Sequence, residues 1–365
     1  MSKVYSADKI FTGIDWLPDH AVITQDEIII DVLPVVSLSE EYVVIKHVPV
    51  IAPAFIDVQI YGAAGKLFAT YPTVDSLAKL YSHCISGGTK NFLPTVATNT
   101  YQVIYKCIDA INAYWKEKGK GVLGLHIEGP WINKIKRGAH IENLIHSPTI
   151  EQAKELLEYG KGVIKMITLA PEICSKEIIE LIRSYDIIIS AGHSNATFNE
   201  ANFGFDNGIT AVTHLFNAMS PLHHREPGLP GAVMQHPWAM SSIIPDGYHV
   251  DFEMISIAKK VMQDRLFIIT DAVTKTSEGL YPHQLAGSAD SYRYESNGIL
   301  SGSALTMIKG VKNLVDKCGI ELSEALRMAS LYPAKLLVLN DHHGKIKKGY
   351  KADLVMLDEK LNVLI

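Results

Sequence analysis

The chain has 365 residues, of which 47% are hydrophobic and 20% are charged, and its formal net charge is −5. This composition is typical of a globular protein with one large domain, or with one large and one small domain. The weak negative charge argues against a nucleic-acid-binding surface, although a local basic pocket could still bind a small anion.

The cysteines and the N-terminus indicate the cellular compartment of the protein. The cysteines form no C-x-x-C pair and are far apart in the sequence, at Cys84, Cys107, Cys174 and Cys318. We expect free thiols in a reducing compartment rather than a disulfide scaffold. The N-terminus has no apolar signal segment, and no apolar run is long enough to span a bilayer. The sequence therefore predicts a cytoplasmic protein.

Short β-branched segments dominate residues 1–50, at 21–23, 27–32 and 42–45. The tail at 344–358 returns to the same pattern. Because each end alone is too small to bury a core, we expect the two ends to pair into one small β-sandwich. The predicted domains are thus the sandwich, residues 1–50 plus 344–365, and a central domain, residues 51–343.

In the central domain, strand patterns alternate with helical patterns such as 149–159 and 175–184, which favours a parallel α/β fold. Candidate strands lie at 54–58, 91–94, 121–127, 165–169, 187–190, 211–213, 242–244 and 266–269. Eight strands fit a (β/α)₈ TIM-type barrel. The alternative, an open doubly wound sheet, would gather ligands at one switch point and leave most polar residues after these strands unexplained.

Three predicted strands end at a potential metal ligand, namely Glu128, His193 and His214. In a barrel such strand ends converge on the C-terminal mouth. Two imidazoles and one carboxylate fill three positions on zinc and leave the fourth for water. Any one of these residues could be a structural group, but the set of three predicts a metal site. His126, on the strand face of Glu128, is either a fourth ligand or a partner of the ligands.

Asp271 ends the apolar strand at 266–269. A carboxylate in that position needs hydrogen-bond partners or a chemical role. We interpret Asp271 as a general base that takes a proton from the water and returns it to the leaving group. The structural alternative is a cap on the next turn. A metal with an adjacent acid predicts metal-assisted hydrolysis.

Several segments could face a substrate. The loop at 217–231 follows the His214 strand and contains Arg225, whose guanidinium can bind an anion bidentately. A lone loop arginine is usually solvated, but the nearby ligand raises the odds of a role. His249 and His140 also follow predicted strands. Residues 300–303 are small and turn-like, so they could approach a ligand closely.

These motifs, in this order, resemble the amidohydrolase superfamily and, within it, the family that deacetylates N-acetylglucosamine 6-phosphate. The similarity runs from residues 53–59 to 349–355 and is carried by 126–131, 192–194, 213–219, 225–228, 246–251 and 300–303. It implies hydrolysis of the acetamide of N-acetyl-D-glucosamine 6-phosphate to D-glucosamine 6-phosphate and acetate, in amino-sugar catabolism and recycling.

The resemblance also implies roles for single residues. Glu128, His193 and His214 would hold one divalent metal ion, expected to be Zn²⁺, with Fe²⁺, Co²⁺ and Mn²⁺ left open because they share such ligands. Asp271 would accept and donate the proton. The implied substrate contacts are Ala139, His140, Asn217, Ala218, Arg225, His249, Leu300, Ser301 and Gly302. Arg225 and His249 match phosphate-side residues that in this family can reach across a dimer interface, so we expect a homodimer.

The sequence departs from many superfamily members after the first barrel strand, where a His-x-His pair carries a second metal. Gln59 and Tyr61 occupy those positions here. A neutral amide and a phenol are poor ligands for a divalent cation, so we expect one tightly bound metal. Gln59 fits a one-metal subgroup of the deacetylases, whereas Tyr61 replaces its usual Asn.

Competing interpretations remain. Within the superfamily the chain could deacetylate another N-acetylhexosamine phosphate, or act as an amidase or a cyclic-amide hydrolase. A non-catalytic sugar-phosphate sensor would have no need of Asp271. A purely structural protein has no positive support in the sequence.

Overall fold

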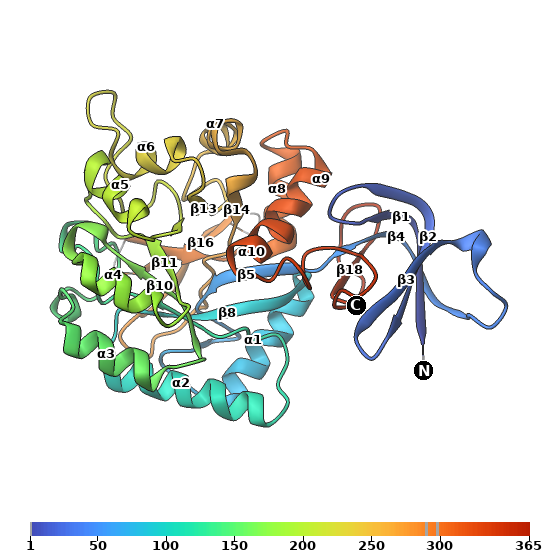
Figure 1. Ribbon diagram of the computed structural model, residues 1–365, viewed down its shortest axis with the longest axis horizontal. Helices are drawn as coiled ribbons and strands as arrows, with labels where there is room; N and C mark the ends of the chain where they lie inside the picture. The colour runs from blue at the N-terminus through green and yellow to red at the C-terminus, as the bar shows by residue number, and fades with distance from the viewer. Residues whose placement is uncertain (1, 289–290, 297–298) are drawn as a thin grey trace.

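The computed structural model describes residues 2–288, 291–296 and 299–365. A barrel of strands surrounded by helices lies beside a smaller sheet, and both chain ends are at the smaller sheet (Figure 1). Within the described ranges, no helix has the length and apolar character needed to cross a membrane.

The barrel is an eight-stranded parallel sheet in the order β14-β13-β12-β11-β10-β9-β8-β5. Its strands are β5 (Phe55–Ile60), β8 (Thr89–Ala97), β9 (Leu125–Glu128), β10 (Ile164–Leu169), β11 (Ile188–Ala191), β12 (Ala211–Val212), β13 (Met240–Ile243) and β14 (Leu266–Ile268). The predicted barrel is confirmed, and each predicted strand overlaps an observed one. These strands have near-continuous apolar sequences because helices cover one face and the barrel interior covers the other.

The barrel closes where β5 meets the segment after β14. The backbone N–H of Asp271 donates to the carbonyl of Gln59 at 3.0 Å, and that of Tyr61 donates to Ala272 at 2.9 Å. Ile60 and Ala272 form a parallel bridge at the same place. Closure pairs the sheet edges, which would otherwise be exposed. It also brings Gln59, Tyr61 and Asp271 together at one seam.

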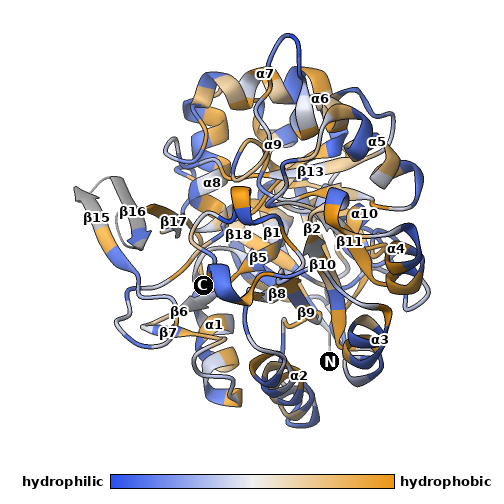
Figure 2. Ribbon diagram, turned by 90° about the vertical axis from the view of Figure 1, so that its left-hand side faces the viewer, coloured by the Kyte–Doolittle hydropathy of each residue, from blue (hydrophilic) through white to orange (hydrophobic). Residues whose placement is uncertain are grey.

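Helices cover the outside of the barrel. They are α1 (Val74–Ser86), α2 (Tyr101–Lys116), α3 (Ile150–Tyr159), α4 (Lys176–Arg183), α5 (Phe198–Asp206), α6 (Gly228–Gln235), α7 (Phe252–Met262), α8 (Met307–Asp316), α9 (Leu322–Ala329) and α10 (Leu331–Leu336). The predicted helix at 149–159 begins with a capping box, in which Thr149 and Gln152 satisfy each other's backbone N–H groups. Figure 2 shows hydrophobic residues concentrated on the central strands and both kinds of residue on each helix, as expected for helices that pack by one face.

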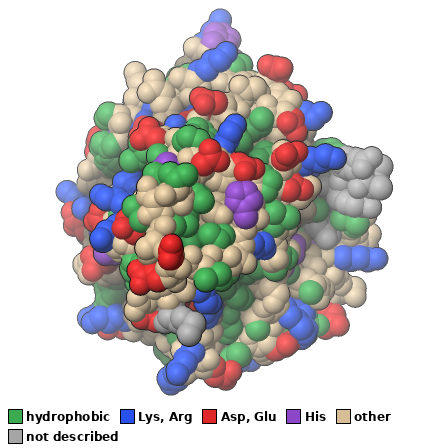
Figure 3. Space-filling view, turned by 90° about the vertical axis from the view of Figure 1, so that its right-hand side faces the viewer, with side chains coloured by type: hydrophobic (Ala, Val, Ile, Leu, Met, Phe, Trp, Pro, Cys, Tyr) green, Lys and Arg blue, Asp and Glu red, His purple; other side chains and the backbone are tan. Residues whose placement is uncertain are grey.

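The two chain ends join in a five-stranded sheet of order β18-β4-β1-β2-β3. Its strands are β1 (Lys3–Phe11), β2 (Trp16–Gln25), β3 (Ile28–Pro34), β4 (Val44–Pro53) and β18 (Leu354–Leu357). The expected pairing of the ends occurs between β18 and β4, which are antiparallel. The face of the molecule that carries this sheet intersperses charges of both signs with apolar side chains (Figure 3). The division into domains at residues 50 and 344 stays a prediction.

Smaller strands follow β5 and β14. They are β6 (Gly62–Ala63), β7 (Lys66–Leu67), β15 (Gln284–Ser288), β16 (Ser291–Ser296) and β17 (Ile299–Ser303). Residues 300–303, expected to be turn-like, lie in β17. β17 pairs with β16 through a register shift, and the N–H of Ser303 donates to the carbonyl of Asp271 at 2.9 Å, but Gly302 within it has a left-handed φ of 73°, as in a turn or bulge.

Asp353 connects the C-terminal tail to the start of β8. Its Oδ2 accepts from Asn91 Nδ2 at 2.7 Å and lies 3.0 Å from His343 Nδ1, and its Oδ1 is 3.3 Å from Lys90 Nζ. Burial raises the pKa of Asp353, but the His343 hydrogen bond and the Lys90 charge together lower it to about 2. The ionised carboxylate therefore stabilises the folded state above its ordinary pKa of 3.8, and this contribution is lost as the pH falls through about 2.

We expect Asp353→Asn to lower the free energy of unfolding at pH 7 by about 2 kcal/mol, the value that follows from the lowered pKa. Urea denaturation measures the difference. Asp316→Asn, at an exposed position in α8, is the control and should leave stability within about 0.5 kcal/mol of wild type. An unchanged stability in Asp353→Asn would contradict this account of how the tail is held.

Candidate active site

A pocket of about 290 Å³ lies at the C-terminal ends of the barrel strands. This volume is near the lower end for small-ligand sites. Every sequence-predicted site residue except Arg225 lines it, namely Glu128, Ala139, His140, His193, His214, Asn217, Ala218, His249, Asp271, Leu300, Ser301 and Gly302. The structure thus brings together residues from strands that are far apart in the sequence.

The three predicted ligands meet around one point. Oε1 of Glu128 lies 3.1 Å from Nε2 of His214 and 3.3 Å from Nε2 of His193, and the two nitrogens are 3.1 Å apart. Ligand atoms on a tetrahedral zinc are roughly 3.3 Å apart, given the usual metal–ligand lengths. We call these three atoms the ligand triangle. Its size and its mixture of carboxylate and imidazole fit a divalent metal ion.

A hydrogen bond outside the ligand triangle sets the orientation of His193. Its Nδ1 lies 3.0 Å from the carbonyl oxygen of Lys136. A carbonyl can only accept, so Nδ1 carries the proton and Nε2 presents its lone pair to the triangle. Such outer hydrogen bonds fix the tautomer of metal-binding histidines.

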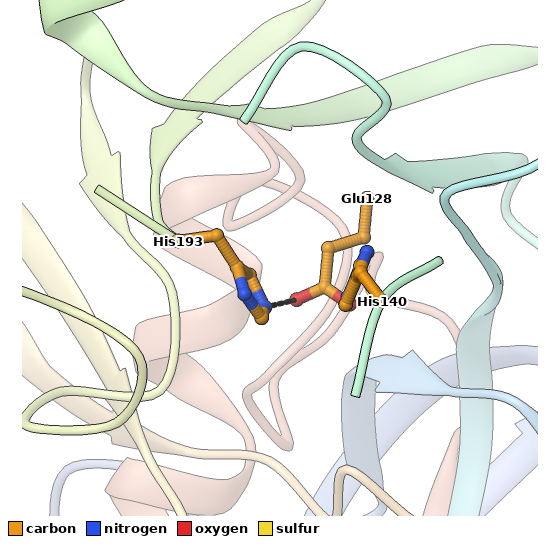
Figure 4. A group of neighbouring side chains, drawn as sticks. All are labelled: Glu128, His140 and His193. Carbon is orange, nitrogen blue, oxygen red and sulfur yellow. Dashed lines mark ion pairs between the residues drawn. The ribbon is translucent and has the colours of Figure 1, made fainter. Parts of the chain in front are cut away.

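His140 approaches the same carboxylate, and its ring lies beside that of His193, with the ring centroids 4.2 Å apart (Figure 4). Potential ligand atoms of Glu128, His140 and His193 lie within 4.8 Å of one another, so distance alone would admit His140 as a ligand. However, Nδ1 of His140 lies 2.7 Å from Oγ1 of Thr98 and 3.4 Å from its backbone nitrogen, while Nε2 faces a carboxylate oxygen of Glu128, which can only accept, so the ring proton is on Nε2. Burial lowers the pKa of His140 to about 4. His140 is therefore a neutral donor, with Nε2 3.3 Å from Oε2 of Glu128.

His126 contacts groups inside the barrel rather than the ligand triangle. Its Nδ1 lies 3.0 Å from the carbonyl of Val58, and its Nε2 lies 2.8 Å from Oγ1 of Thr168. The Thr168 hydroxyl lies in turn 2.8 Å from that of Thr213. Burial lowers the pKa of His126 to about 4. Both nitrogens are thus used within a polar layer of the barrel, which leaves neither for a metal.

Gln59 connects Asp271 to the ligand triangle. Its Nε2 lies 2.8 Å from Oδ1 of Asp271 and 2.9 Å from Oε1 of Glu128. It also lies 2.8 Å from the hydroxyl of Tyr61, which donates to Oε2 of Glu128. Burial raises the pKa of Asp271 well above its ordinary value, and the negative charge of Glu128 raises it further.

Two of the ligands and the predicted base have left-handed backbones, with φ of 48° at His193, 38° at His214 and 53° at Asp271. Each comes two or three residues after its strand ends. Residues other than glycine rarely adopt such angles, and each costs about 1–3 kcal/mol. Strain of this kind is concentrated at functional sites, where packing and hydrogen bonds maintain it.

His249 is held by a carboxylate. Its Nδ1 lies 2.6 Å from Oδ2 of Asp246, whose Oδ1 accepts the backbone N–H of His249 at 2.9 Å. Burial raises the pKa of Asp246, but its bonds to His249 outweigh burial and lower it overall. Because Nδ1 faces the carboxylate, Nε2 is the nitrogen of His249 that a ligand could meet.

Arg225 lies away from this pocket. It belongs to the exposed stretch 221–226 in the projecting loop before α6 (Figure 1), and it lines a separate surface groove with Leu222 and Gln235. Among the described residues that line the main pocket there is no lysine or arginine. The described lining of this pocket therefore offers no strong cation.

Tyr281 and His283 are among the pocket residues that were not predicted from the sequence. The hydroxyl of Tyr281 donates to the carbonyl of Thr98 at 2.5 Å, and its ring centroid lies 6.3 Å from that of His140. Both lie in the segment between β14 and β15, which has no strand or helix period. In the sequence, the one feature that could have indicated a role for Tyr281 and His283 is their position shortly after the predicted base Asp271.

We expect His193→Asn to weaken binding of a divalent cation by more than roughly 100-fold, since even partners of ligands typically contribute 10–100-fold. Retention of Zn²⁺ against a graded chelator measures this affinity. His47→Asn, at an exposed position in β4, is the control. Equal retention by His193→Asn and wild type would remove His193 from the metal site.

Comparisons with known proteins confirm the resemblance. A model described as the amidohydrolase family matches residues 50–364. The chain is 33% identical to N-acetylglucosamine-6-phosphate deacetylase of Haemophilus influenzae, over 97% of this chain and 95% of that protein. It is 31% identical to N-acetylgalactosamine-6-phosphate deacetylase of Escherichia coli O157:H7, over 100% and 97%. The crystal structure of N-acetylglucosamine-6-phosphate deacetylase from Pasteurella multocida superposes with a TM-score of 0.91 at 32% identity, over 100% and 97%.

Proposed function

Since the chain belongs to the amidohydrolase family, we propose that it hydrolyses the acetamide of N-acetyl-D-glucosamine 6-phosphate to D-glucosamine 6-phosphate and acetate. The observation that carries the proposal is the ligand triangle with Asp271 hydrogen-bonded beside it through Gln59. The similarity extends over nearly the whole of a relative with this activity. A cytoplasmic location, expected from the sequence, remains part of the proposal.

Glu128, His193 and His214 would hold one divalent cation. Such an ion, when bound, supplies Lewis acidity at the amide carbonyl and lowers the pKa of water. Zn²⁺ is the expected ion, and Fe²⁺, Co²⁺ or Mn²⁺ could share these ligands. Gln59 and Tyr61 are poor ligands for a second cation, which supports a one-metal enzyme.

The chain's own groups would position the substrate and move the proton. Asp271 accepts the proton of the attacking water and then donates it to the departing amine. The Gln59 amide at Oδ1 of Asp271 fixes the direction of this carboxylate. His140, which lines the pocket beside Glu128, would contact the acetamide region of the substrate. Residues 217–218 and 300–302 enclose the sugar.

Binding of the phosphate would need a second copy of the chain. Phosphate recognition favours arginine, whose planar fork binds two oxygens at once. The described lining of the pocket offers His249 but no arginine or lysine, whereas Arg225 lies on an exposed, projecting loop. We infer a homodimer in which Arg225 of one subunit completes the phosphate site of its partner, with His249 nearby.

We expect Asp271→Asn to retain the cation and to lose roughly 10²–10⁴-fold in kcat, the usual contribution of a positioned acid or base. Acetate release measures turnover, and metal analysis of the same sample checks the ligands. Near-normal turnover in the variant would exclude Asp271 as the proton carrier.

We expect Arg225→Ala to reduce kcat/KM for N-acetyl-D-glucosamine 6-phosphate by roughly 10-fold or more, since hydrogen bonds to a charged group contribute about 1.5–3 kcal/mol. Hydrolysis of unphosphorylated N-acetyl-D-glucosamine should change little. Arg183→Ala, in α4, is the control. An equal loss on both substrates would contradict a phosphate-binding role for Arg225.

Co-expression of Arg225→Ala with Asp271→Asn distinguishes the two places in which Arg225 could act. If it acts across the interface, a mixed dimer contains one intact site, so a random mixture recovers about a quarter of wild-type activity. If Arg225 acts within its own subunit, no mixed dimer contains an intact site, and activity stays at the level of the variants.

The relative that acts on N-acetylgalactosamine 6-phosphate makes that epimer a second candidate substrate. Acetate release from the 6-phosphates of both sugars, with metal analysis of the purified protein, tests the main proposal and shows which of the two sugar phosphates is the better substrate. Faster release from the galacto epimer would favour the second candidate. Binding of both without acetate release would indicate a sensor.

A further inference from the structure

Tyr61 has a position that the proposed reaction leaves unexplained. Its hydroxyl accepts from Nε2 of Gln59 at 2.8 Å and donates to Oε2 of Glu128. Because the amide nitrogen can only donate and the carboxylate can only accept, the phenolic proton is directed to the carboxylate. Burial raises the pKa of Tyr61 well above its ordinary value, and the charge of Glu128 raises it further, so the phenol stays a neutral donor.

The two oxygens of Glu128 have different surroundings. Oε1 faces the ligand triangle, 3.1 Å from Nε2 of His214, and receives one donor, Nε2 of Gln59, at 2.9 Å. Oε2 receives two donors, the Tyr61 hydroxyl and Nε2 of His140, the latter at 3.3 Å. Both lone pairs of Oε2 are thus occupied, whereas Oε1 keeps one lone pair for a cation.

Contacts of the backbone and the ring of Tyr61 hold its hydroxyl in place. The backbone N–H of Tyr61 donates to Ala272 across the barrel seam, and its carbonyl accepts from Phe68 at 2.8 Å. The ring packs against the cluster of Leu67, Val273 and Tyr281. The phenol therefore has little freedom to move away from Glu128.

We propose that Tyr61 is a positioning residue for the metal ligand Glu128. Its hydroxyl fixes Oε2, so that Glu128 binds the cation through Oε1 alone and in one orientation. This inference rests on the proposed function, because it requires that Glu128 be a ligand. Tyr61 would then orient a metal ligand, in addition to being unable to bind a second cation itself.

The test removes the hydroxyl and keeps the ring. We expect Tyr61→Phe to bind Zn²⁺ 10–100-fold more weakly than wild type, the usual effect of removing the partner of a ligand. Retention of Zn²⁺ by the purified holoenzyme against a graded chelator measures affinity independently of activity. Tyr105→Phe is the matched control, since it also removes a hydrogen bond from a tyrosine to a glutamate, Glu155, but at the surface. It should retain Zn²⁺ as wild type does.

A second variant separates the hydroxyl from the packing of the ring. Tyr61→Leu should lose about as much Zn²⁺ affinity as Tyr61→Phe if the hydroxyl is responsible. Normal affinity in Tyr61→Phe, with or without a loss in Tyr61→Leu, would overturn the inference. A wild-type protein that neither retains Zn²⁺ nor releases acetate would instead overturn the proposed function, so the two failures are distinguishable.

Discussion

The buried negative charge of Glu128 is the constraint on which the rest of the site depends. Its side chain is almost fully enclosed, and an enclosed carboxylate is costly unless charges or donors compensate it. Burial raises the pKa of Glu128, but its electrostatic interaction with His193 and its contacts with His140, His193 and His214 lower the pKa well below its ordinary value. The carboxylate therefore stays ionised. One cation at the ligand triangle would compensate it and engage both imidazoles.

The barrel supplies the surroundings that this charge requires. Parallel strands carry Glu128 and the two histidines to one rim, and left-handed residues turn the chain just after the strands end. Beneath the rim, His126 and the threonine hydroxyls bond to one another and not to the ligands. The polar side chains thus form two groups. Those of the inner layer hydrogen-bond to one another, and those of the rim face the pocket.

Much of this architecture was predictable because strand patterns and strand-end residues are local in sequence. The eight barrel strands follow from short apolar runs in the sequence. The ligand triangle follows from the three runs that stop at an acid or an imidazole. Tyr281 and His283 could not be predicted, because they reach the pocket through a segment without a period. The strand pairing of residues 300–303 depends on β16 and on the carbonyl of Asp271, which comes much earlier in the sequence. The position of Arg225 outside the pocket depends on how its loop folds, which the sequence pattern does not specify.

The seam of the barrel has a consequence for how the protein matures. The hydrogen bonds that join β5 to the segment after β14 belong to Gln59, Tyr61, Asp271 and Ala272, three of which also surround Glu128. Completion of the fold and assembly of the reactive centre are therefore the same event. A newly made chain whose first and last barrel strands have not met lacks Gln59 and Asp271 at their places beside Glu128, however well its other strands are formed.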